Sequence, residues 1–215
     1  MSSINVCIVD DHNLFRKAMV RLLKTFRKVG EVWEVQHGKE LIQLLGKQKP
    51  DVILLDLEMP IMNGVETAEY IIPKYPDLKI IVLTQHNSEK FMLHMLEMGV
   101  HSFLLKNTNP DELERAILSV YEKDFYHNDL ISSVMRKSIS LRSEKPLFSK
   151  MAELSEREKE IFGLICEEHS LKEISVRLNI SEKTIHSHKA HIQQKLGVRN
   201  TVGMIKFAYE NGLLI

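Results

Sequence analysis

The chain has 215 residues, which at about 150 residues per domain corresponds to one large or two small domains. Hydrophobic residues make up 44% and charged residues 27%, close to the averages of about 45–50% and 25% for globular domains, so a disordered or collagen-like chain is excluded. Lys and Arg total 29, as do Asp and Glu. The resulting net charge of zero argues against a protein coated in basic charge to bind nucleic acid or anionic lipid.

The two cysteines indicate a reducing compartment. Cys7 and Cys166 lie far apart in different sequence contexts, so they imply no disulfide framework. The N-terminus lacks the basic segment and the long apolar segment of a signal peptide, and no apolar run approaches the roughly 18 residues of a membrane span. We therefore expect a soluble, cytoplasmic protein that does not associate with a membrane.

Residues 1–124 alternate between strand and helix patterns. Amphipathic stretches separate short runs rich in β-branched residues. The motif Asn-Pro-Asp-Glu at 109–112 predicts the start of a helix, with asparagine as the N-cap, proline at the first helical position and acidic residues in the first turn. Strand followed by helix, five times over, predicts a parallel sheet covered on both faces. The expected strands are Ile4–Val9, Glu31–Gln36, Val52–Leu55, Ile80–Thr84 and His101–Leu105.

The pattern changes after residue 124. Residues 125–150 mix serines with basic residues and close with Pro146, which predicts a linker, helical near Ile131–Met135. From Leu154 onward the pattern is helical in four short segments, over residues 155–168, 171–178, 182–196 and 201–211. We therefore expect an α/β domain over 1–124, a linker over 125–150 and a small all-α domain over 151–215.

Polar residues stand at the carboxyl ends of the expected strands, where doubly wound sheets carry their functional groups. They are Asp10-Asp11, Asp56, Thr84 and Lys106. Converging carboxylates repel one another unless a cation compensates, and Mg²⁺ suits such oxygen ligands. A lysine and a hydroxyl beside them would serve a transferring phosphoryl group, for which a carboxylate can be the nucleophile.

The residues at the strand ends form a longer series. They belong to the motifs Val9-Asp10-Asp11-His12, Leu55-Asp56-Leu57-Glu58-Met59-Pro60 with Gly64, Thr84, and Phe103-Leu104-Leu105-Lys106. This series resembles the receiver domain of two-component response regulators, and the resemblance covers the whole first domain. It implies a flavodoxin-like, doubly wound sheet of five parallel strands. Gln85 and His86 follow Thr84 where many receivers have a small residue first, so Gln85 would slow access to Asp56.

The resemblance also implies a role for each motif residue. Asp56 would accept a phosphoryl group from a sensor histidine kinase, and Lys106 would contact the phosphoryl oxygens. Thr84 would swing toward the phosphoryl group, and Phe103 would be the switch aromatic that turns inward with it. The Mg²⁺ ligands would be Asp10, through water, together with Asp11, Asp56 and the backbone carbonyl of Glu58.

Residues 171–196 carry a helix-turn-helix pattern, in which Asn179-Ile180 form the turn and Ser181 caps a longer second helix. One stripe of that helix is apolar, with Ile185, Ile192 and Leu196. The opposite face carries small, polar and weakly basic side chains, as in a helix that reads the major groove. The basic residues between 181 and 199 outnumber the acidic ones, with Lys183, Lys189, Lys195 and Arg199 against Glu182.

The second domain resembles a LuxR-type DNA-binding domain over about residues 152–214. The resemblance rests on Leu154-Ser155-x-Arg157-Glu158-x-Glu160-Ile161, Lys172-Glu173-Ile174, Ile180-Ser181-x-Lys183-Thr184-Ile185, His188 and Lys195-Leu196-Gly197-Val198. A receiver followed by such a domain is the architecture of NarL-type response regulators. Leu171 and His186 depart from the usual Asn and Glu, which leaves the operator sequence open.

We expect eight residues of the second helix to contact DNA. His186 could donate to guanine and Ala190 could touch a thymine methyl group, whereas Thr184, Lys189 and Lys195 would bind phosphates. His186, His188 and His191 do not share one helix face, so we expect no metal site there. The full expected set is Lys183, Thr184, His186, Ser187, Lys189, Ala190, Gln194 and Lys195.

Three functions are compatible with these motifs. The first is a transcription regulator controlled by phosphorylation, binding double-stranded DNA as a homodimer when phosphorylated or DNA-bound. The second is an Mg²⁺-dependent phosphatase, disfavoured because such enzymes usually carry Asp-x-Asp after the first strand whereas Asp10-Asp11 are contiguous. The third is a phosphotransfer adaptor whose helical domain no longer binds DNA. We expect the first, with no enzymatic activity beyond autophosphorylation and slow autodephosphorylation of Asp56.

Overall fold

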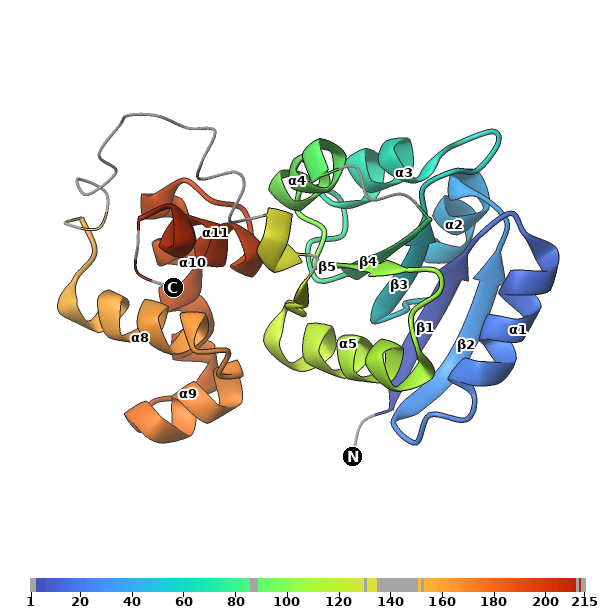
Figure 1. The fold of residues 1–215 in the computed structure, drawn as a ribbon. Helices are drawn as coiled ribbons and strands as arrows, with labels where there is room; N and C mark the ends of the chain where they lie inside the picture. The colour runs from blue at the N-terminus through green and yellow to red at the C-terminus, as the bar shows by residue number, and fades with distance from the viewer. Residues whose placement is uncertain are drawn as a thin grey trace.

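Figure 1 shows a domain built around a sheet beside a smaller helical domain. This computed structural model describes residues 3–85, 89–129, 131–134, 151, 153–211 and 213. The described ranges do not include His86. They also do not include Met135 and residues 136–150 of the expected linker. Among the described helices, none combines the length and the apolar character needed to span a bilayer.

The sheet has five parallel strands in the order β2-β1-β3-β4-β5, which confirms the expected doubly wound fold. The order reverses between β1 and β3, and ligands of such sheets bind at the carboxyl ends beside this reversal. β2 begins at Val29, two residues before the expected Glu31, and ends at Val35. The strands are β1 (Ile4–Val9), β2 (Val29–Val35), β3 (Val52–Asp56), β4 (Lys79–Thr84) and β5 (Ser102–Leu105).

Helices cover both faces of the sheet. α1 (Asn13–Leu23) and α5 (Pro110–Lys123) pack on one face, and α2 (Gly38–Leu45), α3 (Gly64–Ile71) and α4 (Glu89–Met98) pack on the other (Figure 1). All five residues of β3 are buried, because this central strand is covered from both sides. The site-bearing ends of β1 and β3 are therefore held in a rigid core.

Two helix starts place loops beside those strand ends. Asn63 caps α3, and its side chain and that of Glu66 form a capping box. Asn109 caps α5 by accepting from the amide of Glu112, and Pro110 stands in the first turn as expected. Gly64 allows a close approach, because a Cβ at this position would lie 2.2 Å from the carbonyl oxygen of Asp56.

The C-terminal domain has its own apolar core, formed by four helices. The helices are α8 (Glu156–Cys166), α9 (Leu171–Leu178), α10 (Glu182–Leu196) and α11 (Thr201–Glu210). Asn179 adopts a left-handed conformation at the end of α9, with φ of 52°, and turns the chain toward α10. Ser181 caps α10 by accepting from the amide of Thr184 over 3.1 Å. The expected helix-turn-helix is thus present.

The described part of the expected linker packs on the N-terminal domain. Phe125, Ile131 and Val134 are at most 3% exposed and belong to the apolar cluster on the α2–α4 side of the sheet. Residues 131–134 are helical, in agreement with the expected helix near Ile131–Met135. The packed unit therefore extends about ten residues beyond the expected boundary at 124, because these apolar side chains find a place in its core.

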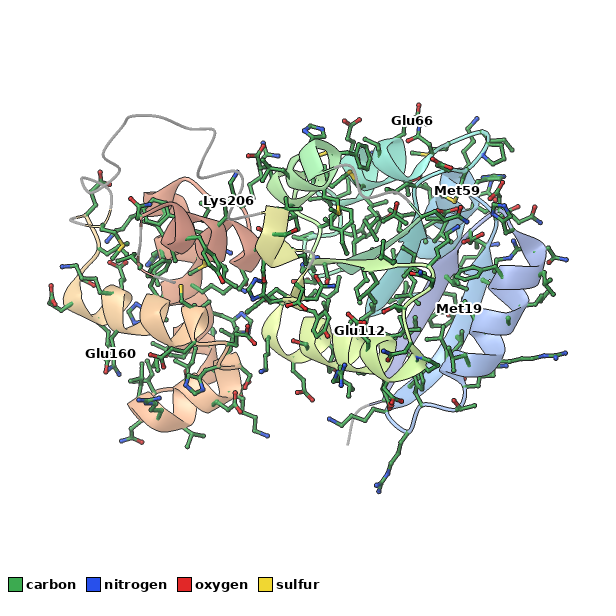
Figure 2. The ribbon with its side chains drawn as sticks, viewed as in Figure 1. Met19, Met59, Glu66, Glu112, Glu160 and Lys206 are labelled. Carbon is green, nitrogen blue, oxygen red and sulfur yellow. The ribbon has the colours of Figure 1, made fainter. Side chains whose placement is uncertain are left out.

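α11 packs against the N-terminal domain beside α4. Val202 and Ile205 of α11 are each 3% exposed and belong to the same apolar cluster as the buried methionines of α4. Lys206 lies at this junction and forms an ion pair with Glu97 at the end of α4 (Figure 2). The helical domain is thus docked on the sheet domain through α11.

Candidate functional site

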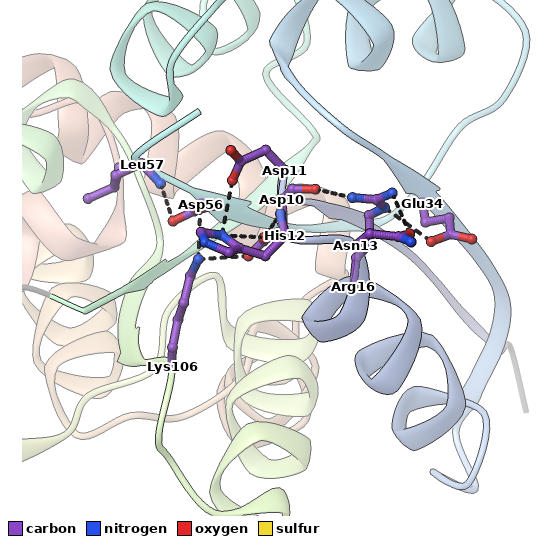
Figure 3. A network of polar contacts seen from close by, with 9 residues as sticks. All are labelled: Asp10, Asp11, His12, Asn13, Arg16, Glu34, Asp56, Leu57 and Lys106. Atoms are coloured by element: carbon purple, nitrogen blue, oxygen red, sulfur yellow. Dashed lines mark hydrogen bonds and ion pairs between the residues drawn. The ribbon is translucent and has the colours of Figure 1, made fainter. Parts of the chain in front are cut away.

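The aspartates at the strand ends converge (Figure 3). Asp10 follows β1 directly, Asp11 is next, and Asp56 is the last residue of β3. Asp10 and Asp56 are 0% and 3% exposed. One ligand atom from each of these three residues and from His12 lies within 4.8 Å of the others. We call the site formed by Asp10, Asp11, Asp56 and Lys106 the acidic pocket.

Lys106 supplies the positive charge of the acidic pocket from the residue that follows β5. Its Nζ lies 2.7 Å from Asp56 Oδ2 and 2.8 Å from Asp10 Oδ2. The backbone amide of Leu57 donates to Asp56 Oδ1 over 2.8 Å. One oxygen of Asp56 is therefore ion-paired and the other hydrogen-bonded, which fixes the orientation of the carboxylate.

Burial and ion pairing shift the pKa values of these two groups. Burial raises the pKa of Asp56 above its usual value, although Lys106 opposes the shift. For Lys106, burial lowers the pKa, but the contacts with Asp10 and Asp56 outweigh it and raise the pKa overall. Lys106 therefore stays protonated and can neutralise an anion bound beside Asp56.

The donor set of the acidic pocket fits a divalent cation. Asp10 Oδ2, Asp11 Oδ1 and Asp56 Oδ2 are buried and make no hydrogen bond of ordinary geometry within the part of the chain described. Their nearest cationic atoms are Lys106 Nζ and His12 Nδ1, which is 3.1 Å from Asp11 Oδ1. Two of the three carboxylates thus share one lysine. Hard oxygen donors of this kind suit Mg²⁺. Glu58, whose carbonyl is the fourth expected ligand, lies in the loop after β3 with an exposed side chain.

The two expected switch residues lie on neighbouring strands. Thr84 ends β4 and is 3% exposed, and Phe103 on β5 is fully buried. Their strands pair in parallel, with Thr84 opposite Leu105. Because its side chain is fully buried, Phe103 occupies an inward position. Gln85, beyond Thr84, is exposed and lines a cavity together with Thr84 and Lys106.

A network behind the pocket was not predicted from the sequence (Figure 3). Arg16 of α1 is 5% exposed, and its guanidinium donates to the backbone carbonyl of Asp10 over 2.6 Å and to Asn13 Oδ1 over 3.1 Å. It also forms an ion pair with Glu34 of β2, 3.2 Å away. The available signal was the spacing of Arg16 from Met19 and Leu23, three and seven residues later on the buried face of α1.

The structure separates the expected DNA-contacting residues of α10 into two groups. Lys189 is 8% exposed and forms an ion pair with Asp124 of the N-terminal domain, and Lys195 is half-buried with its Nζ 2.6 Å from Glu158 Oε2. Hydrogen bonds from Lys195 and Ser155 lower the pKa of Glu158 to about 2. The other expected residues are exposed along one side of α10, namely Lys183, Thr184, His186, Ser187, Ala190 and Gln194.

Comparison with protein families matches both domains. Residues 6–118 match the response regulator receiver domain, and residues 152–208 match the bacterial regulatory proteins of the luxR family. The chain is 32% identical over 228 residues to the transcriptional regulatory protein DegU of Brevibacillus brevis, covering 98% of this chain and 95% of DegU. It is also 32% identical over 212 residues to the response regulator UvrY of Escherichia coli K12, with the same coverage.

Solved structures of RcsB share the fold over nearly the whole chain. The RcsB–DNA complex superposes with a TM-score of 0.58 at 28% identity, covering 97% of this chain and 99% of RcsB. RcsB from Salmonella enterica serovar Typhimurium, bound to promoter rprA in the presence of the phosphomimetic BeF3-, gives 0.58 at 29% identity, covering 99% and 100%. With both domain families matched in order, the chain belongs to the response regulators that join a receiver domain to a LuxR-type DNA-binding domain.

Proposed function

We propose that this response regulator controls transcription through phosphorylation of Asp56 by a sensor histidine kinase. The observation that carries the proposal is the ion pair of 2.7 Å between Asp56 and Lys106 inside a pocket with two further aspartates. In the transfer, an oxygen of Asp56 attacks the phosphorus of a phosphohistidine, the phosphorus–nitrogen bond breaks, and its electron pair stays on the imidazole. The leaving imidazole takes up a proton from solvent.

The residues of the acidic pocket have separate tasks in this proposal. Lys106 neutralises phosphoryl oxygens, and Thr84 donates its hydroxyl to one of them. Mg²⁺, held by Asp10, Asp11, Asp56 and the carbonyl of Glu58, would offset the charge of the phosphoryl group as it moves between nitrogen and oxygen. Movement of Thr84 would then be passed to Phe103 and the surface around β5.

The DNA-binding domain would act on a duplex through α10. The exposed side of α10 carries the small and polar side chains suited to base edges, and its basic residues suit phosphates. A homodimer would place two such helices on half-sites about one helical turn apart. Because we propose duplex DNA as its target, we also propose that the protein acts in the cytoplasm.

Phosphorylation of the Asp56→Asn variant tests the receiver half of this proposal. With Mg²⁺ and a small acyl-phosphate donor, we expect wild type to gain one acid-labile phosphoryl group by intact-mass spectrometry and Asp56→Asn to gain none, since the amide is not a nucleophile. Asp77→Asn, an exposed residue in the turn before β4, is the matched control and should behave as wild type. Labelling of Asp56→Asn at the wild-type rate would show that Asp56 is not the acceptor.

The salt dependence of DNA binding tests the other half. About six phosphate contacts would give a slope near −5 in a log–log plot of affinity against salt. Lys183→Ala should reduce the magnitude of that slope by about one, because one phosphate contact is lost. Lys24→Ala, an exposed lysine at the end of α1, is the control and should not change it. A phosphorylated protein without salt-dependent DNA binding would support the phosphotransfer adaptor instead.

A further inference from the structure

We infer that His12 is a metal ligand in the acidic pocket, so that the pocket selects a first-row transition-metal ion, such as Mn²⁺, over Mg²⁺. The inference rests on the proposed function in that it takes the acidic pocket as the cation site. It adds a nitrogen donor to the three carboxylates and identifies the residue that sets the preference among ions. Mg²⁺ then fills the pocket only where it is in large excess.

The His12 side chain turns toward the carboxylates of the pocket (Figure 3). Its Nδ1 lies 3.1 Å from Asp11 Oδ1 and 3.5 Å from Asp10 Oδ1. The side chain is 63% exposed, so packing does not force it into this position. His12 is the N-cap residue of α1, but its side chain makes no capping hydrogen bond. Within the described part of the chain, the contacts that orient the ring are therefore those with the two carboxylates.

The backbone fixes the place from which His12 reaches the pocket. The amide of His12 donates to Asp10 Oδ1 over 2.8 Å, and its carbonyl accepts from the amide of Arg16 over 2.9 Å. Asp10 is itself fully buried at the end of β1. The turn that carries the imidazole is thus hydrogen-bonded on both sides. A donor placed in this way before an ion arrives loses little freedom on binding.

The separations between the donors suit a single ion. One ligand atom from each of Asp10, Asp11, His12 and Asp56 lies within 4.8 Å of the others. In an octahedral site with ligands at about 2.1 Å, neighbouring ligands are about 3.0 Å apart and opposite ligands about 4.2 Å apart. The distance of 3.1 Å from His12 Nδ1 to Asp11 Oδ1 is that of two neighbouring ligands.

The charge of the pocket and its unpartnered oxygens point to a cation independently of His12. Asp11 Oδ1 is buried and makes no hydrogen bond within the described chain, and the same holds for Oδ2 of Asp10 and of Asp56. Lys106 meets the two Oδ2 atoms, whereas His12 faces the Oδ1 atoms of Asp10 and Asp11. Three negative charges against one lysine leave two, which a divalent cation balances.

An imidazole distinguishes between ions that carboxylates bind alike. Mg²⁺ takes oxygen ligands and keeps several waters, whereas transition-metal ions also accept an imidazole nitrogen. His12 Nδ1 and Asp11 Oδ1, at 3.1 Å, can share either a proton or a cation. If they share a proton, His12 is only an ion-pair partner of Asp11. If they share a cation, a bond joins the metal to nitrogen, and that bond can be measured.

His12→Asn is the sharpest test, because the amide oxygen of asparagine stands about where Nδ1 stood. Asparagine is also a favoured N-cap, so α1 keeps its start. With the full chain, the electron paramagnetic resonance signal of free Mn²⁺ gives the dissociation constant for Mn²⁺, and competition gives that for Mg²⁺. We expect the preference for Mn²⁺ over Mg²⁺ to fall at least about 10-fold, with the affinity for Mg²⁺ largely retained.

Two further variants separate the nitrogen donor from other effects. His37 caps α2 by accepting from the amide of Glu40 and lies outside the cluster of the acidic pocket, so His37→Asn is the matched control. It should keep the wild-type preference. Asp11→Asn removes a charged ligand instead, and it should weaken the binding of both ions together.

Electron spin-echo modulation of bound Mn²⁺ detects the metal–nitrogen bond itself. We expect nitrogen modulation in wild type and in His37→Asn, and none in His12→Asn. The absence of nitrogen modulation in wild type, or its persistence in His12→Asn, would overturn the inference, because no nitrogen of His12 would then be bonded to the ion. Equal losses of Mn²⁺ and Mg²⁺ affinity in His12→Asn would also overturn it, since His12 would then act through charge alone.

The proposed function fails by a different result. Labelling of Asp56→Asn at the wild-type rate would overturn the proposed acceptor, while the spin-echo measurement would still report whether His12 binds the ion. If Mn²⁺ and Mg²⁺ both bind without nitrogen modulation, the acidic pocket remains a cation site and only the inference about His12 is wrong. If neither ion binds, both the cation role of the pocket and the inference are wrong.

Discussion

At the scale of single residues, the acidic pocket depends on side chains that its motifs do not contain. Arg16 fixes the backbone of Asp10 through the carbonyl oxygen, and Glu34 of the edge strand orients Arg16 in turn. The turn that carries Asp10 and Asp11 is therefore tied to both α1 and β2. Partners of this kind hold metal-binding carboxylates in place although they touch neither cation nor phosphoryl group.

His101 gives the protein a pH dependence that can be assigned to one residue. Its pKa is lowered from 6.5 to about 3, first by burial and then by Lys79. The unfolded chain therefore binds a proton near pH 6.5 that the folded chain does not, and folding stability falls as the pH drops below 6.5. We expect a loss of about 1.4 kcal/mol per pH unit between about pH 6 and pH 5.

The control for this prediction is His101→Asn, because an amide oxygen can accept from Ile80 without titrating. Urea unfolding at a series of pH values should show a slope in wild type that is missing from the variant. Asp124 and Glu158 are two of the carboxylates with lowered pKa values, and they lose their contributions to stability only at lower pH. Parallel pH profiles for wild type and His101→Asn would contradict the assignment.

At the scale of secondary-structure elements, close approach between α3 and β3 fixes the loop beside Asp56. A Cβ on Gly64 would lie 2.2 Å from the carbonyl oxygen of Asp56 and 2.8 Å from the Cα of Leu57. Both are backbone atoms, which cannot move away at low energetic cost. We expect Gly64→Ala to lower the free energy of unfolding by about 2 kcal/mol, as overpacking does, and to slow phosphorylation of Asp56.

Gly163 in α8 is the matched control, because a Cβ there meets nothing within 4 Å. Gly163→Ala should raise the free energy of unfolding by about 0.5–1 kcal/mol, since alanine loses less entropy in a helix. Denaturant unfolding measures both changes, and acyl-phosphate labelling measures the rate. Equal stability changes in the two variants would contradict the role given to the α3–β3 contact.

The elements and the acidic pocket could be predicted because their signals are local. Strand ends, helix caps and the order of Asp10, Asp56, Thr84 and Lys106 along the chain are all visible in short windows. The edge strand β2 begins two residues before its predicted start. Its start is determined by pairing with β1 rather than by its own composition. The ion pair between Lys189 and Asp124 joins residues that are 65 positions apart in the sequence. No local sequence pattern could therefore predict it.

At the scale of the whole molecule, we expect phosphorylation and DNA to act on one equilibrium, the contact between the receiver and α10 through Asp124 and Lys189. Beryllofluoride is the phosphomimetic in the promoter-bound RcsB structure, and because it binds reversibly it allows an equilibrium test on this chain. By linkage, the factor by which it tightens DNA binding must equal the factor by which DNA tightens its own binding. We expect a factor of about 5–150 for wild type, measured by titrating each ligand at saturation of the other.

We expect that factor to depend on Asp124, whose carboxylate pairs with Lys79 and with Lys189 of α10. A ligand can shift DNA affinity only through the docked fraction that remains to be released. Asp124→Gly lacks the carboxylate that pairs with Lys189, so we expect its docked fraction to be small. Both factors should then fall toward one in this variant, whereas Glu122→Gln should keep the wild-type value. Retention of the full factor in Asp124→Gly would mean that a different contact, such as α4 against α11, couples the acidic pocket to α10.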